Sequence, residues 1–168
     1  MKTLRLSVTR VVLSLVVVVL SGLAWWAGTP ARAAFAPTIA LIPASGIVNG
    51  QPESVKFSGR AQVSSELVLD TSKFNVPPAV ILIFDLSNVS GIGSSTGAKY
   101  VAGGSGTSVY RPLVSNDTVE ITFPFSRGTT MSTTSARSGV ASFALGFDLN
   151  TGAITSGTAN IAGPAFQY

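Results

Sequence analysis

The 168-residue sequence contains no cysteine and no histidine. Without cysteine the chain cannot form a disulfide, a thiolate nucleophile or a cysteine zinc cluster. Without histidine it has no imidazole metal ligand and no serine–histidine–aspartate relay. No serine–lysine motif and no phosphate-binding loop replaces them. We therefore expect a protein that is not an enzyme and holds no cofactor.

Charged residues are also scarce, and they are unevenly distributed. The chain has 11 Lys and Arg against 7 Asp and Glu, which gives a formal net charge of +4. Four of the basic residues and none of the acidic ones lie in residues 1–33. The rest of the chain is close to neutral, and this balance argues against a nucleic-acid partner.

The first 33 residues have the layout of an export signal. Residues 1–10 are basic, residues 11–24 are apolar, and Ala31–Ala33 offers small residues at a cleavage site. This order is typical of a secretory signal peptide. A retained membrane anchor is the alternative. The apolar stretch from residue 11 to Gly28 is only just long enough for a helix that spans a membrane, and Gly28–Pro30 interrupts it.

We therefore expect residues 1–33 to be a signal peptide and residues 34–168 to be one exported domain. Contact with a membrane would occur only through the signal segment before cleavage. The location would be the periplasm, the cell surface or the medium. A bacterial source is favoured, because exported animal domains of this size usually carry disulfides.

Residues 34–168 show the alternation typical of β-strands and almost no helical period. Apolar residues alternate with polar ones over residues 55–69, 118–125 and 141–147. Residues 79–84 are apolar at every position, which predicts a central strand with two buried faces.

Turn residues separate these predicted strands. Asn49-Gly50 predicts a hairpin that joins residues 39–48 to the following strand. Gly152 is placed for a left-handed turn before a weaker strand over residues 153–161. Residues 87–107, with six glycines, and the Ser/Thr-rich residues 126–138 are predicted as long loops, the first with a short strand at Tyr100-Val101.

The spacing predicts about seven to nine strands, and thus an all-β fold built as an antiparallel β-sandwich, immunoglobulin-like in outline. The alternative is a small outer-membrane β-barrel, since the chain ends on the aromatic Tyr168. Pro164 interrupts that final strand, and the sandwich is therefore favoured.

Few residues are candidates for a site. Asp148, Asn150 and Asp117 offer oxygen ligands for calcium at strand ends. Side chains of this kind more often stabilise turns by bonding their own backbone, and we favour that role. Tyr100 and Tyr110 are candidate interaction residues.

We expect a structural, adhesive or protein-interaction module, whose partner is a protein or a glycan at the cell surface. Self-association through β-edges is one form of this, and Thr38–Ile42 could be a donated strand, although pairing within its own sheet is favoured. A carbohydrate-binding module is the alternative, and it requires Tyr100 and Tyr110 on one exposed surface.

Overall fold

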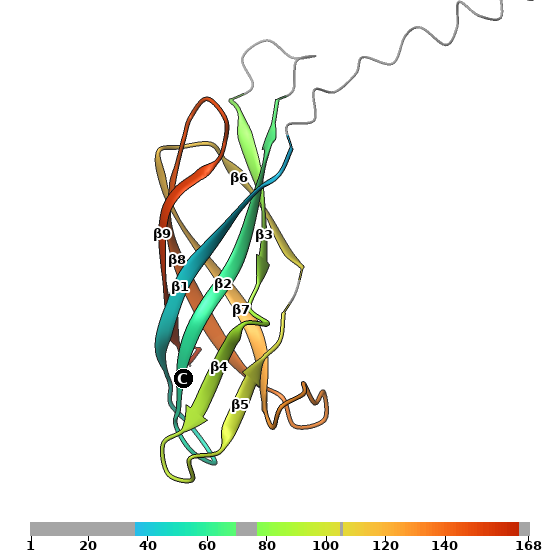
Figure 1. Ribbon diagram of the computed structural model, residues 1–168, viewed down its shortest axis with the longest axis vertical. Coiled ribbons are helices and arrows are strands. Elements are labelled where there is room, and N and C mark those ends of the chain that lie inside the picture. Colours follow the sequence, from blue (N-terminus) through green and yellow to red (C-terminus); the bar gives the residue numbers. More distant parts are fainter. Residues whose placement is uncertain (1–35, 70–76, 105, 165–168) are drawn as a thin grey trace, which may run out of the picture. The chain divides into compact units, whose positions relative to one another are not determined.

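A computed structural model describes residues 36–69, 77–104 and 106–164, and all regular structure in these ranges is β-strand. The predicted signal peptide and the C-terminal aromatic lie outside the described residues. No helix in the described ranges is long and apolar enough to cross a membrane. In chain order the strands are β1 (Thr38–Val48), β2 (Val55–Val68), β3 (Ala79–Asp85), β4 (Val89–Gly93), β5 (Lys99–Ala102), β6 (Thr107–Pro112), β7 (Asn116–Arg127), β8 (Arg137–Phe147) and β9 (Ile154–Ala162) (Figure 1).

The nine strands form one mixed sheet, in the order β1-β9-β8-β7-β5-β4-β2-β3-β6. β1 also pairs with β2, so the pairings close a ring through β1, β9, β8, β7, β5, β4 and β2. The prediction of a purely antiparallel sheet is wrong at one position, because β1 runs parallel to β9. These strands are the first and last that the described ranges contain, so no tight hairpin forces them to be antiparallel.

The long strand β2 changes partner along its length. Its first part, Val55–Gly59, pairs with β4, and its second part, Gln62–Val68, pairs with β3. The change falls just after Gly59, where a Cβ atom would collide with the backbone oxygen of Asn88. β3 and β6 therefore branch away from the closed ring, and β6 ends the sheet (Figure 1).

One core lies between the strands of the closed ring and the inward side of β3, and aromatic side chains fill much of it. The alternation predicted for β2, β7 and β8 is confirmed, and Leu69 beyond the end of β2 is the exception, being 40% exposed. The ring of Phe57 makes edge contacts with Phe123 and Phe125, at centroid distances of 5.8 and 5.1 Å. Among the described residues, five phenylalanines are fully buried: Phe57, Phe84, Phe123, Phe125 and Phe143.

The prediction of two buried faces for residues 79–84 is wrong. Val80, Leu82 and Phe84 are buried, but Ile81 is half-buried and Ile83 is 41% exposed. β3 is hydrogen-bonded on both edges, to β2 and β6, and faces the core on one side only. A continuous apolar run does not distinguish a strand buried on both faces from one with an exposed apolar face.

The glycine-rich residues 87–107 contain β4, β5 and the start of β6, where the sequence predicts mainly a loop. A Cβ atom on Gly91 would lie 2.5 Å from Val55 Cγ1 and 2.9 Å from the ring of Phe57, so a larger residue at this position of β4 would force these core side chains to move. The loop predicted over residues 126–138 is largely confirmed, since β7 ends at Arg127 and β8 begins at Arg137.

The predicted hairpin and the predicted left-handed glycine are confirmed, although the hairpin connection covers residues 49–54 rather than two residues. Asn49-Gly50 lies in the connection between β1 and β2, which pair antiparallel along their whole shared length. Gly152 adopts a left-handed φ of 69° before β9. Thr38–Ile42 pairs with β2 of its own chain, as the sequence favours.

Candidate functional site

The most elaborate polar cluster surrounds Glu53, in the connection between β1 and β2. Its side chain is only 7% exposed. The backbone N–H groups of Ser95 and Thr96 each donate to Oε2 at 3.0 Å. The hydroxyl groups of Thr96 and Tyr100 donate to Oε1 at 2.7 and 2.9 Å. The carboxylate thus fastens the β4–β5 turn to the β1–β2 connection.

These donors stabilise the ionised form of the carboxylate. The hydrogen bond from the Thr96 hydroxyl, reinforced by the other donors, outweighs the opposing effect of burial and lowers the pKa of Glu53 from 4.5 to about 2. Burial, together with the hydrogen bond that its hydroxyl donates to Glu53, raises the pKa of Tyr100. The carboxylate accepts all four of these hydrogen bonds, so Glu53 is held firmly and is poorly placed to exchange a proton with a substrate.

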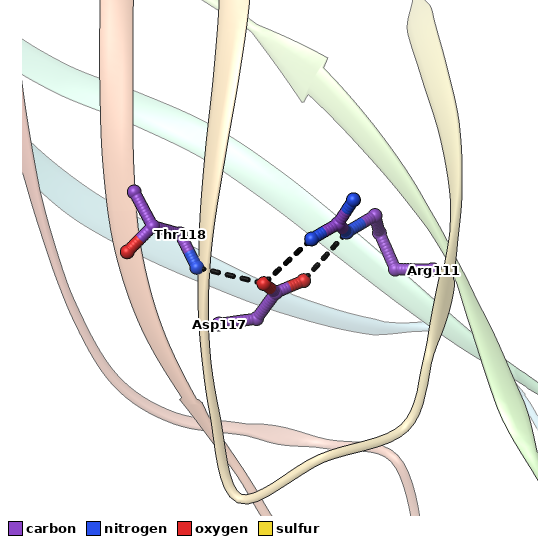
Figure 2. A network of polar contacts seen from close by, with 3 residues as sticks. All are labelled: Arg111, Asp117 and Thr118. Atoms are coloured by element: carbon purple, nitrogen blue, oxygen red, sulfur yellow. Dashed lines mark hydrogen bonds and ion pairs between the residues drawn. The ribbon is translucent and has the colours of Figure 1, made fainter.

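A second polar cluster joins β6 to β7 (Figure 2). The Arg111 guanidinium donates to both carboxylate oxygens of Asp117, with Nε–Oδ2 and Nη2–Oδ1 distances of 2.7 and 2.8 Å. The backbone N–H of Thr118 donates to Oδ1 as well. The bidentate contact with Arg111 lowers the pKa of Asp117.

The two carboxylates among the candidate calcium ligands each accept protein donors. Asp117 is engaged by Arg111, whereas Asp148 accepts the backbone N–H of Asn150 at Oδ1, at 2.8 Å. The side chain of Asp148 therefore supports its own turn, as the sequence favours. Within the described ranges, no group of three or more acidic side chains is placed to hold a metal ion.

The two candidate tyrosines lie in contrasting surroundings. Tyr100 on β5 is 3% exposed and donates to Glu53, whereas Tyr110 on β6 is 62% exposed. They cannot form one aromatic platform for a sugar ring, and only Tyr110 is available to a partner.

Exposed apolar residues gather on one face of the sheet, the side of β1, β2, β3 and β6 that points away from the core. We call this the apolar face. Ile39 on β1 and Ile83 on β3 lie on either side of Ser64 in one register row. In the next row Ile81 lies opposite Tyr110. The exposed large apolar members of this face are Ile39, Leu41, Ile47, Ile83 and Tyr110, between 41% and 64% exposed.

A shallow hollow of about 500 Å³ lies on the outer face of β7, β8 and β9. Its polar lining comes mainly from Asn116, Thr118, Ser156 and Thr158. Small residues at the centre, Ala144 and Gly146, create the space. The hollow offers hydroxyl and amide groups but no aromatic ring.

No protein-family model, no curated protein and no solved structure matches this chain. The candidate surfaces therefore rest on the geometry of the chain itself. The sequence pointed to Tyr110, but it missed the Glu53 cluster because Thr96 and Tyr100 lie more than 40 residues further along the chain.

Proposed function

We propose that this chain is an exported, non-catalytic module of the periplasm or cell surface that works by binding other proteins, with an immunoglobulin-like sandwich as its outline. One observation carries the proposal, the apolar face. Apolar side chains concentrated on one sheet face are a usual mark of a protein-interaction surface.

The composition of this face supports a protein partner. Ile39, Leu41 and Ile83 offer aliphatic contact area, and Tyr110 adds an amphipathic ring of the kind enriched in interface cores. Polar residues such as Ser64 and Gln62 lie between them, in the mixture common to interfaces that form and dissociate.

Site-specific photo-crosslinking tests the proposed function. A photoreactive residue replaces Ile83 on the apolar face, and a matched control replaces Asn160, an exposed residue on the outer face of β9. In cells that produce the protein we expect a discrete protein adduct from position 83 only, and its loss when Tyr110→Asp is added. No adduct at position 83, or the same adducts from both positions, would contradict the proposal.

The N-terminal sequence supports export, and mass spectrometry of the purified protein tests it. We expect the mature chain to begin at Ala34. A chain that retains residues 1–33 would support the anchored alternative instead.

A carbohydrate-binding module is the second candidate, and the hollow on β7, β8 and β9 favours it. Ala144→Phe would fill the hollow, whereas Ser142→Phe adds the same ring two residues along the same face of β8. A glycan array should lose its signal with the first variant and keep it with the second. An array without any signal for the unmodified protein would reject this candidate.

A further inference from the structure

β6 is an edge strand with one neighbour, β3, among the residues that the structure describes. The backbone N–H of Leu113 donates to the carbonyl of Pro78. These two residues lie opposite each other, two positions beyond the pair formed by Val80 and Arg111. In an antiparallel pair such hydrogen-bonded positions alternate along the strand. Arg111 and Val109 therefore direct their backbone groups toward β3.

Ser108 and Tyr110 must then direct theirs away from β3. Pro112 occupies the next outward position, and it has no N–H to donate. At the other end, the N–H of Gly106 is already used on the carbonyl of Phe84. The open edge thus offers complete donor and acceptor sets at two residues only, Ser108 and Tyr110.

This short edge is complementary to itself. When two copies of β6 lie antiparallel about a two-fold axis at Val109, Ser108 of each faces Tyr110 of the other, and each pair exchanges both N–H···O bonds. We propose that the chain forms a dimer through β6, in this register, so that the β1-β2-β3-β6 layer continues into a second copy. This inference rests on the proposed function and names a partner for it.

The side chains beside the edge favour this occupant. Ser108 lies between Ile83 on β3 and the open edge, and its small side chain leaves Ile83 exposed. In the proposed register the partner's Tyr110 covers Ser108 and reaches Ile83. Two of the exposed members of the apolar face become buried together, which an arbitrary peptide strand would not achieve.

Charge does not oppose the pairing. Arg111 is the charged residue of β6, and its guanidinium is bound to Asp117 on β7. In the proposed register Arg111 faces the partner's Thr107, so no like charges lie opposite each other.

Cysteine cross-linking tests the register directly, and the chain has no cysteine of its own to interfere. Residues in a hydrogen-bonded pair have Cα atoms about 5.5 Å apart, within the range of a disulfide. Diagonal neighbours are about 7–8 Å apart, beyond that range. A mixture of full-length Ser108→Cys and Tyr110→Cys proteins should therefore form a disulfide-linked dimer under mild oxidation, in far higher yield than either variant alone. No dimer, or equal yields from the three samples, would overturn the proposal.

Sedimentation velocity over a range of protein concentrations provides a second test. Tyr110→Pro removes an outward N–H from each copy and leaves the bonds to β3 in place. The loss of two backbone hydrogen bonds per dimer should raise the dissociation constant about 30-fold. Tyr110→Ala keeps the N–H and separates the contribution of the side chain, and circular dichroism checks that both variants fold. If Tyr110→Pro fails to fold, the cysteine pair still decides.

A protein that remains monomeric at every concentration, yet gives an adduct with another protein from position 83, would overturn the dimer and leave the proposed function standing. A monomer without such an adduct would contradict both.

Discussion

Phe57 provides the strongest test of the core, because its aromatic side chain connects β2 to the phenylalanines of β7. It is fully buried, contacts Phe123 and Phe125, and lies against Gly91 of β4. Truncating a buried phenylalanine to alanine costs about 3–5 kcal/mol, and each aromatic pair is worth about 0.5–1.5 kcal/mol beyond the buried area. With two such pairs lost, we expect Phe57→Ala to lower the free energy of unfolding by about 4–5 kcal/mol.

Urea unfolding followed by circular dichroism measures this loss. Phe57→Leu keeps most of the volume and should cost less than half as much. Leu149→Ala is the surface control, since Leu149 is exposed in a turn, and it should change stability by no more than about 0.5 kcal/mol. A loss below about 1.5 kcal/mol for Phe57→Ala would refute the packing described here.

Three further predictions concern the polar clusters and turns. The pKa of Glu53 is lowered from 4.5 to about 2, so its carboxylate stabilises the fold fully above pH 4.5, and this stabilisation is lost as the pH falls toward 2. In the Glu53→Gln variant, the melting temperature should therefore fall less steeply over that pH range. An unchanged dependence of the melting temperature on pH would contradict the role of the carboxylate. Gly152→Ala should lower the free energy of unfolding, measured in urea, more than Gly97→Ala does. Both glycines have a left-handed φ, which costs alanine about 1–2 kcal/mol, but only at Gly152 would the new Cβ press on the core, 3.1 Å from Leu67 and Val80. Equal losses for the two variants would argue against that contact. Calcium or a chelator should leave the melting temperature unchanged, because Asp117 and Asp148 already accept protein donors; a rise with calcium would show that their oxygens are free to coordinate.

Local patterns predicted much of this fold. The alternation in β2, β7 and β8 identifies strands with one buried face, and that face is the one the sequence indicates. A glycine at position 152 predicts the turn, because the left-handed conformation required there is one that other residues avoid. Such features depend on a few neighbouring residues, and a single sequence contains them.

Features that depend on distant residues were missed. The glycine-rich β4 is a strand because it pairs with β2 and β5, and the packing of its Gly91 against Phe57 is a contact between two strands that no local rule contains. The exposure of Ile83 depends on what covers β3, which its apolar sequence does not reveal. Glu53 belongs to a cluster only because the β4–β5 turn folds back over it.

We propose that the β6 edge and the apolar face beside it form the contact surface of this protein. Residue-resolved amide hydrogen exchange, measured by NMR at low and high protein concentration, tests this proposal. We expect the amides of Ser108 and Tyr110 to exchange fast in dilute solution and to become protected as the concentration rises, whereas Val109 and Arg111 are protected throughout by β3. Exchange at Ser108 and Tyr110 that stays fast at every concentration would contradict the self-pairing of the β6 edge.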